Sequence, residues 1–425
     1  MERTSRTSGQ WWNLAAAGLA LRAVLLPYGG YPTDIASFKA WAVALAANGP
    51  VAFYGSGFAD YLPGYLYVLW LVGELDALFR FNDVAWLVTL KLPATLADLA
   101  TAWLLLHVGT RAGHPVGLGV AAAYLFNPGV VFTSAVWGQV DAVGALLMLT
   151  GLWALARPAP APVAGPTLLA VAALIKPQVA PALLPAALAV LRLSAAHPPA
   201  ARLRLLALAA VVPLAIVAVL AWPFGLTLAD LALRLRDAAR VYPYGSVMAF
   251  NLWGAVQGFW VTDAARWAGV PIAVWGLVLG GGAAAATAVL AWRAGPQRAL
   301  LPATAVILLA AFALPTRVHE RYLLPALPAL AAAGYADRRC WRLYGLASGL
   351  FALNVLYAYT RPHLQTLRLP PWLEQTLFAA PVVRALGAVA VLVLAWGLVI
   401  LRDLSRHPQE TAAPATTDAP ARRTP

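Results

Sequence analysis

The sequence predicts an all-α, polytopic membrane protein with about 12 transmembrane helices. Of its 425 residues, 61% are hydrophobic and only 11% are charged, whereas soluble domains carry about 25% charged residues. Apolar segments long enough to cross a bilayer also recur along the whole chain. The net charge of +13 is then expected to orient the loops and to attract lipid phosphates. Membrane lipids are therefore expected partners, and nucleic acid is not.

The expected spans follow one another at short intervals. They are 11–28, 85–108, 115–134, 138–156, 164–176, 178–193, 204–222, 267–292, 299–315, 322–336, 342–360 and 380–401. The two runs on either side of Lys176 are short, so they could instead form one re-entrant hairpin. At the N-terminus, Arg3 and Arg6 precede an apolar run with no small-residue cleavage site after it, which predicts an uncleaved first span rather than a removed signal peptide.

Arginines in the short connections predict the orientation of the chain. They recur in alternate turns, for example at Arg111 and Arg157, and such turns face the cytoplasm. Both termini are therefore expected in the cytoplasm, with the protein in the inner (plasma) membrane and its long aromatic loops facing the periplasm or exterior. The expected organisation is a transmembrane core over 1–335, further helices over 336–404 and a disordered tail over 405–425.

The first outer loop, residues 29–84, contains the stretch YPTDIASFKAW. Asp34, Phe38, Trp41 and Leu45 follow the spacing i, i+4, i+7, i+11, so they share one face of an amphipathic helix. A carboxylate at the membrane boundary on such a helix is well placed to act on a lipid-borne substrate. Aspartate after a Pro-Thr pair is also a favoured helix N-cap, and this stretch alone favours the cap.

Two further polar groups follow in the outer loops. Asp60 and Tyr61 begin the sequence DYLPGY, which suits an interfacial helix. Asp60 is either a second carboxylate of a site or another N-cap. The sequence WGQVD ends the connection between two spans. Its Trp137 is expected to anchor the membrane interface, and its Gln139 and Asp141 could hold sugar hydroxyls. A purely structural cap on a tight helical hairpin is the alternative.

Lys176, in the sequence KPQ, lies between two apolar runs near the membrane surface. Its ammonium group is expected either to snorkel to the surface or to pair with a carboxylate or an anionic lipid headgroup. Asn251 lies in the aromatic stretch YPYGSVMAFNLW, which follows a basic run. This stretch could line a groove for a lipid phosphate or a sugar, and it could equally be an interfacial aromatic belt.

The sequence RVHERY places four ionisable groups at the outer end of a late span: Arg317, His319, Glu320 and Arg321. A positive cluster on the outer side opposes the topology rule, so an ordinary loop explains it poorly. Two guanidinium groups and an imidazole suit a lipid-linked phosphate, because arginine binds phosphate oxygens in a bidentate manner. Glu320 could orient His319 or a cation. The alternative is a local, purely structural cluster of salt bridges.

The order of these motifs resembles that in the GT-C superfamily of membrane glycosyltransferases. An early Asp before an aromatic helix is followed by D-Y-x-P-x-Y, N-P…W-G-Q-x-D, K-P-Q, N-x-W and H-E-R-Y. Bacterial relatives of the GPI mannosyltransferases and the dolichol-dependent glucosyltransferases are the most similar, over roughly 11–335. The resemblance implies membrane-parallel helices in the first outer loop. It also implies Asp34 as the catalytic base, Asp60 as the second loop carboxylate, and His319 with Glu320 near a donor phosphate.

This resemblance implies transfer of a single sugar, mannose favoured, from a polyprenyl-phosphate donor to a lipid- or glycan-linked acceptor on the outer face. The transfer inverts the anomeric centre. The residues expected to bind the donor phosphate are Arg317, His319, Arg321 and Lys176. Those expected at the substrate and acceptor are Asp60, Tyr61, Gln139, Asp141, Glu320 and Asn251. No cofactor is required, although a divalent metal could bind if Asp34, Asp60 and Glu320 converge.

A lipid or sugar transporter, or a flippase, is the alternative class. Many spans with charges at their edges fit that class too. However, the sequence contains no internal repeat, and most ionisable residues are expected on one outer surface rather than at the membrane midplane. Asp98 and Lys91, within one apolar run, are partial exceptions. The single Cys340 excludes an intrachain disulfide and any cysteine-based metal site.

Overall fold

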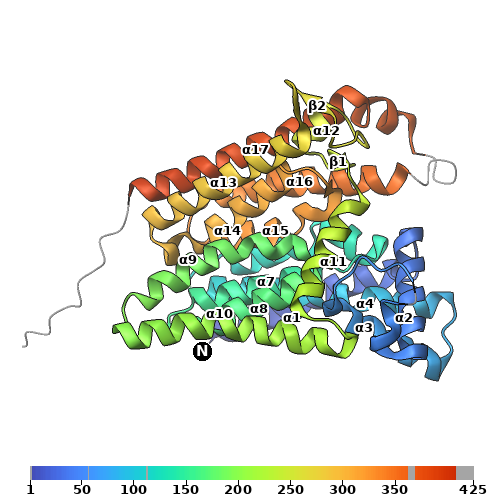
Figure 1. Cartoon of the computed structure of the whole chain (residues 1–425), viewed down its shortest axis with the longest axis horizontal. Helices are drawn as coiled ribbons and strands as arrows, with labels where there is room; N and C mark the ends of the chain where they lie inside the picture. The colour runs from blue at the N-terminus through green and yellow to red at the C-terminus, as the bar shows by residue number, and fades with distance from the viewer. Residues whose placement is uncertain (1, 56, 112, 362–368, 408–425) are drawn as a thin grey trace, which may run out of the picture.

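The protein folds into long, side-by-side helices, seen in a computed structural model that describes residues 2–55, 57–111, 113–361 and 369–407 (Figure 1). Almost all of the regular structure is helical. In the described part, the strands form two small pairs. β1 (Ser246–Val247) runs parallel to β4 (Val318–His319), and β2 (Arg266–Trp267) runs antiparallel to β3 (Val270–Pro271). The expected all-α class is confirmed, with these short exceptions.

The helices of the first half of the chain include three short turns of other helix types. In order, they are α1 (Glu2–Leu25), α2 (Pro32–Phe53), α3 (Pro63–Phe79), α4 (Asp83–Arg111), α5 (Gly117–Leu125), α6 (Pro128–Val131), the π-helix η1 (Phe132–Trp137), α7 (Asp141–Ala156), α8 (Ala164–Ile175), the 3₁₀ helix η2 (Pro177–Ala182), α9 (Leu183–Ser194), α10 (Pro199–Ala221) and the 3₁₀ helix η3 (Trp222–Phe224). Prolines begin several of these helices, which fits the preference of proline for the first helical turn.

The second half contains the other helices and all four strands. The helices are α11 (Leu228–Val241), α12 (Leu252–Val256), α13 (Ile272–Ala294), α14 (Pro296–Ala313), the 3₁₀ helix η4 (Glu320–Leu323), α15 (Ala326–Ala333), α16 (Arg339–Thr360), the π-helix η6 (Leu373–Leu377) and α17 (Ala380–Arg406). Buried residues on both sides of position 335 belong to one hydrophobic core. Most of the tail predicted to be disordered, 408–425, lies outside the described residues.

Seven described helices are long and apolar enough to cross a membrane, or eight if the bent pair of α5 with α6 and η1 forms one span. This finding is consistent with a multi-pass membrane protein, but the predicted count of about 12 is not confirmed. The 16-residue α7 would extend only about 24 Å, less than the roughly 30 Å of a bilayer core. Apolar sequence alone cannot separate such buried helices from spanning ones, because both avoid water.

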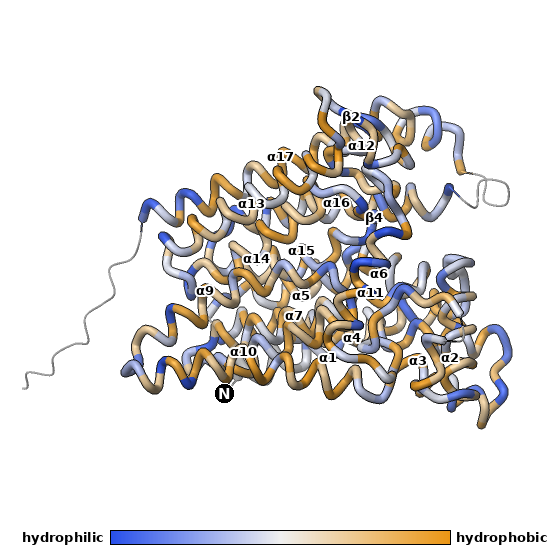
Figure 2. The backbone as a smooth tube through the Cα atoms, viewed as in Figure 1, coloured by the Kyte–Doolittle hydropathy of each residue, from blue (hydrophilic) through white to orange (hydrophobic). Residues whose placement is uncertain are grey.

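One end of the bundle carries the polar loops and the short strands. Figure 1 shows α2, α3, α11, α12, β1 and β2 gathered at the right-hand end, while α17 finishes at the left-hand end. In Figure 2 the long helices are mostly orange, and blue hydrophilic segments concentrate at the two ends and around β4. The residues expected to bind substrate come from this right-hand group of elements and from the ends of the long helices next to it.

A buried ion pair joins three helices inside the bundle. Arg22 of α1 donates from Nε (3.2 Å) and Nη2 (3.0 Å) to Oδ2 of Asp98 in α4, and neither side chain is exposed. Ser134 in η1 donates to the same oxygen at 2.6 Å. Arg22 Nη1 donates to the carbonyl of Leu125 at 2.9 Å. Lys91 makes no pair with Asp98, because its Nζ donates to the carbonyls of residues 26 and 28.

Candidate active site

Asp34 enters the site from the first turn of α2. The helix begins at Pro32 with Tyr31 as its N-cap residue, and no side chain caps it. The cap interpretation of Asp34 is therefore wrong. The backbone N–H groups of Gly30 and Tyr31 donate to the carbonyls of Val136 (2.8 Å) and Trp137 (2.9 Å). These two bonds fasten the start of α2 to the end of η1 and bring Asp34 beside the WGQVD sequence.

Both hydrogen bonds that the described residues make to the Asp34 carboxylate end on one oxygen, Oδ2. Trp137 donates from Nε1 at 2.7 Å and Gln139 from Nε2 at 2.5 Å. The intervening Gly138 has φ +90°, in the left-handed region that glycine adopts without strain. A Cβ there would lie 2.8 Å from Ile35 Cδ1 in α2. The tight turn thus aims two flanking side chains at the same carboxylate and leaves Oδ1 for another donor.

Lys176 supports this arrangement from the break between α8 and η2. Its Nζ donates to Tyr61 Oη at 2.5 Å and to Gln139 Oε1 at 3.1 Å, and it lies 4.4 Å from the centre of the Tyr61 ring. The side chain is buried, so it does not snorkel. Burial lowers the pKa of Lys176, which weakens its hold on the proton. Gln139 thus connects the Lys176 ammonium group to the Asp34 carboxylate.

Tyr61 reaches this network because the start of α3 packs against the end of α8. Gly64 allows that approach, since a Cβ there would lie 2.7 Å from the carbonyl oxygen of Leu174. The Tyr61 hydroxyl in turn donates to Gln139 Oε1 at 3.2 Å. Asp60, next to Tyr61, is not an N-cap, because the N-cap of α3 is Leu62. Burial raises the pKa of Asp60, and the positive charge of Lys176 opposes that rise.

Arg321, in η4, lies among carboxylates from two other parts of the chain and that of its own neighbour. Its Nη1 donates to Glu320 Oε1 at 2.6 Å and lies 4.0 Å from Asp34 Oδ2. Its guanidinium carbon lies 5.0 Å from the centre of the Trp137 ring. Burial alone would lower the pKa of Arg321, but Glu320, Asp34 and Asp141 raise it above its ordinary value. The guanidinium group is therefore a permanent cation at the centre of the cluster.

Two buried polar atoms face each other without a hydrogen bond. Arg321 Nε and Asp141 Oδ2 lie 4.0 Å apart, and neither has a partner among the described residues. The other oxygen of Asp141, at the start of α7, accepts a hydrogen bond from Gln178. Unpaired buried groups of this kind cost free energy, and such groups often mark a place where a ligand binds. They leave Arg321 with an N–H to offer to a bound anion.

Glu320 belongs to the same cluster, and His319 borders it. Burial lowers the pKa of His319 to about 3, with further contributions from the positive charges of Arg321 and Lys176. Its imidazole is therefore neutral at physiological pH, and it packs edge-on against Tyr242 with ring centres 4.8 Å apart. Burial raises the pKa of Glu320, against the positive charge of Arg321. His319 can thus offer a ligand one neutral N–H rather than a positive charge.

Two predicted residues lie apart from this cluster. Arg317 donates to Asp263 Oδ2 at 2.6 Å and to the carbonyl of Ala239 at 2.9 Å, and its backbone φ of +64° turns it away from its neighbours in the sequence. Asn251 is fully buried, and its side chain accepts a hydrogen bond from the N–H of Gly254 at the start of α12. Arg317 thus ties the end of α11 to the RVHERY loop, and Asn251 caps a helix.

We call the residues that the structure brings together the Asp34 cluster: Asp34, Tyr61, Trp137, Gln139, Asp141, Lys176, Glu320 and Arg321. Sequence reasoning treated Trp137 as an interface anchor and did not include Gln178. Trp137 shares the WGQ motif with Gln139, and Gln178 shares the KPQ motif with Lys176. These shared motifs were the sequence signals that could have identified both residues. In the described part of the chain, no three His, Cys, Asp or Glu side chains are placed to hold a metal ion, so Asp34, Asp60 and Glu320 do not form such a group.

No protein-family model matches the chain, and no curated protein matches its sequence. The geometry of the Asp34 cluster and the apolar helices beneath it therefore carry the functional argument.

Proposed function

We propose that the protein is an inverting membrane glycosyltransferase that takes a single sugar, mannose favoured, from a polyprenyl-phosphate donor. The observation that carries this proposal is the Asp34 carboxylate, whose Oδ2 is held by Trp137 and Gln139 while Oδ1 has no hydrogen bond among the described residues. A general base needs a fixed orientation and a free oxygen within reach of the acceptor proton. The structural carboxylate of Asp98 also has one oxygen without a partner among the described residues, but that side chain is fully buried, whereas the Asp34 side chain is 22% exposed and so open to an acceptor.

The reaction is a single displacement at the anomeric carbon. The acceptor hydroxyl oxygen attacks that carbon while its proton passes to Asp34, and the bond from the carbon to the phosphate oxygen breaks. The electron pair of that bond leaves with the polyprenyl phosphate, which gains negative charge. Arg321 and Lys176 are the cations in reach of this charge, and prepositioned cations stabilise such a transition state. His319 supplies at most a neutral N–H, and Arg317, bound to Asp263, takes no part in this scheme.

The apolar helices beneath the site support a lipid-borne donor. A prenyl chain needs a hydrocarbon environment. Helices long enough to cross a membrane would place the protein in the bilayer, where such a chain can lie beside them. In this proposal the end of the bundle that holds α2, α3 and β4 faces the periplasm or exterior, with the acceptor a glycolipid or glycan on that side. The buried Arg22–Asp98 pair gives the rival transporter class little support, because its charges neutralise each other.

The first test compares wild-type protein with Asp34→Asn in lipid nanodiscs, using a short-chain polyprenyl-phosphate-mannose donor and a panel of glycan acceptors. We expect Asp34→Asn to lower kcat at least 100-fold while thermal unfolding and donor binding are unchanged, because only the base is lost. The matched control is Asp83→Asn, which removes an exposed carboxylate that pairs with Lys39 and should leave transfer unchanged.

Three outcomes would contradict parts of this proposal. Full activity of Asp34→Asn would remove the role of Asp34 as base. Failure of wild-type protein to turn over mannose, glucose and arabinose donors, with polyprenyl phosphate still bound, would favour the transporter class. The assay is also run with EDTA, and activity that is lost and then restored by Mg²⁺ or Mn²⁺ would show that Arg321 and Lys176 need a divalent metal to neutralise the phosphate.

A further inference from the structure

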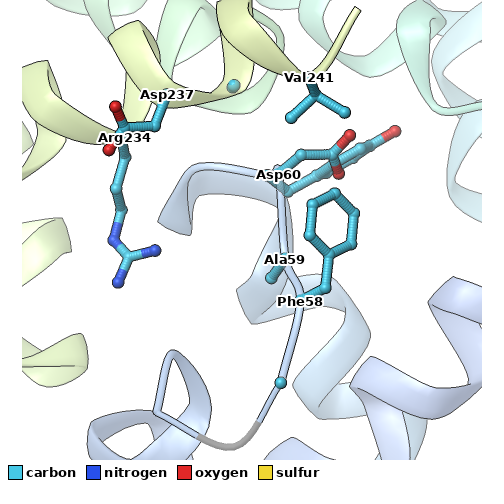
Figure 3. Close-up of a pocket in the computed structure, with 9 residues that line it drawn as sticks. Phe58, Ala59, Asp60, Arg234, Asp237 and Val241 are labelled. Atoms are coloured by element: carbon cyan, nitrogen blue, oxygen red, sulfur yellow. The ribbon is translucent and has the colours of Figure 1, made fainter.

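A pocket opens between the first outer loop and α11, beside the Asp34 cluster. It has a volume of about 260 Å³, and its lining comes from residues 57–61 on one side and from α11 on the other. Figure 3 shows Asp60 of the loop close to Val241 at the end of α11, with Arg234 and Asp237 farther back along the same helix. Pockets of this size hold small organic groups rather than whole lipids.

The polar groups of the pocket are suited to hydroxyl donors. Among the described residues, the Asp60 carboxylate has no side-chain hydrogen-bond partner and no ion pair, and it faces the pocket. Asp237 pairs on the outside with Arg236 (3.0 Å). The guanidinium carbon of Arg234 lies 3.6 Å from the centre of the Tyr54 ring. The lining thus holds two carboxylates, Asp60 and Asp237, and one guanidinium group, Arg234. Ionised carboxylates accept hydrogen bonds and repel anions, so this net negative lining favours an uncharged ligand rich in hydroxyls.

The pocket also leads to the proposed base. Tyr61 contributes to its lining, and its hydroxyl donates a hydrogen bond to Gln139, the residue that holds Asp34. The two cations of the cluster, Lys176 and Arg321, are not among the lining residues. Charge therefore divides the region into two parts. One part contains Arg321 and Lys176, which suit a phosphate. The other has a net negative lining, with two carboxylates and one guanidinium group, which suits an uncharged sugar.

We propose that this pocket binds the sugar end of the acceptor, an uncharged glycan, and that α11 forms its outer wall. The role of the pocket as an acceptor site rests on the proposed glycosyl transfer, but sugar binding to the pocket can be tested without any transfer. In this arrangement Asp60 accepts hydrogen bonds from sugar hydroxyls, and Val241 closes the pocket over the ring. The pocket rejects anionic sugars, because their carboxylates would meet the carboxylate of Asp60.

The binding test uses saturation-transfer NMR on the full-length protein in nanodiscs. The probes are methyl mannoside, methyl glucoside and methyl glucuronide; the last two differ only in a carboxylate at C6. We expect the two neutral sugars to bind and the glucuronide to bind at least tenfold more weakly. Val241→Trp fills the pocket and should lower neutral-sugar affinity at least tenfold. The matched control is Leu235→Trp, on the exposed face of α11 outside the pocket, which should change nothing.

A second variant examines the charge argument. Asp60→Asn keeps the size of the side chain and removes its charge. It should therefore lower the affinity for neutral sugars several-fold and reduce the discrimination against the glucuronide. Equal binding of glucoside and glucuronide to wild-type protein would overturn the proposal. Unchanged binding by Val241→Trp, or no binding of any neutral sugar, would do the same.

The transfer assay separates this inference from the proposed function. Val241→Trp should raise the acceptor KM at least tenfold and leave the donor KM unchanged, because the lining contains neither cation of the cluster. If transfer occurs and the acceptor KM is unchanged, the pocket proposal fails alone. If neutral sugars bind as expected but no donor is turned over, the glycosyltransferase proposal fails and the sugar pocket remains.

Discussion

Two arginines, each beside an aspartate, differ in how completely they are paired. Arg22, inside the bundle, uses all three of its nitrogens in hydrogen bonds to Asp98 and to backbone carbonyls. Arg321, at the polar end, donates to Glu320, while its Nε has no partner and lies 4.0 Å from Asp141. The first arginine has nothing left to offer a ligand, so its role is structural. The second keeps bonding capacity, which an incoming anion could use.

The largest expected effect follows from breaking the fully buried pair of Arg22 and Asp98. Arg22→Met leaves the buried Asp98 without its cation, and removal of one partner of a buried pair costs about 3–5 kcal/mol. We expect this loss in the free energy of unfolding, measured by denaturant titration in detergent. The double variant Arg22→Met/Asp98→Asn should recover part of the loss. If Arg22→Met is as stable as the wild type, the pair is not structural.

The second effect follows from the same change at the unsaturated arginine. We expect Arg321→Met to lower kcat/KM for the donor roughly 100-fold, because the charge that stabilises the leaving phosphate is lost. The unfolding free energy should fall as well, because the buried carboxylates of Glu320 and Asp141 lose their cation, but by less than in Arg22→Met, since Arg321 is partly exposed. Steady-state kinetics with varied donor concentrations provide the measurement. Arg321→Lys should restore only part of the rate, since lysine lacks the planar fork. An unchanged donor KM and kcat would assign Arg321 to the structural class.

A smaller effect is expected where the Asp34 cluster holds its carboxylate. Trp137→Phe removes the Nε1–H that donates to Asp34 while keeping a ring to stack on Tyr31, whose ring centre lies 4.7 Å from that of Trp137. Loss of one hydrogen bond to a charged group predicts a fall in kcat of about tenfold. Trp275→Phe, which loses an indole bond to a backbone carbonyl at the surface, is the control. Equal small effects of the two variants would show that Trp137 does not position Asp34.

The smallest expected effect is a loss of stability at acidic pH that is caused by His319. The folded protein holds the pKa of His319 at about 3, below the ordinary value near 6.5, so between these values the unfolded chain binds a proton that the folded chain does not. Stability should therefore fall as the pH drops below about 6.5, by about 1 kcal/mol at pH 5.5 from this residue. Unfolding of the wild type and His319→Asn at pH 7.5 and 5.5 measures it. If both lose stability equally, His319 is not held neutral.

The sequence allowed prediction of the all-α class and of the main members of the cluster. The motif order singled out Asp34, Gln139, Lys176 and Arg321, and the structure brings these four together. Each is a polar or charged residue in a mostly apolar sequence, which is why the sequence could identify it as a candidate. The count of spans could not be predicted, because apolar composition is the same for a helix facing lipid and one buried in the bundle.

The partners of the aromatic and basic residues also depended on information outside their own segments. Trp137 resembles an interface anchor until the end of η1 is fastened to the start of α2. Arg317 resembles its neighbour Arg321, but the left-handed backbone at Arg317 directs its side chain to Asp263. Local sequence contains neither the docking of η1 on α2 nor the position of Asp263, so both assignments needed the folded chain.

The distances along the chain inside the Asp34 cluster have a consequence for biosynthesis. Asp34 and Gln139 are separated by 105 residues, and Lys176 follows Gln139 by 37 more. Arg321 comes still later, from the last third of the chain. During synthesis, the base, its holding groups and Lys176 are thus made well before Arg321, the second cation that is proposed to stabilise the leaving phosphate. A ribosome-bound chain that has not reached η4 would contain the base without that cation, so the newborn protein should remain inactive until most of it has entered the membrane.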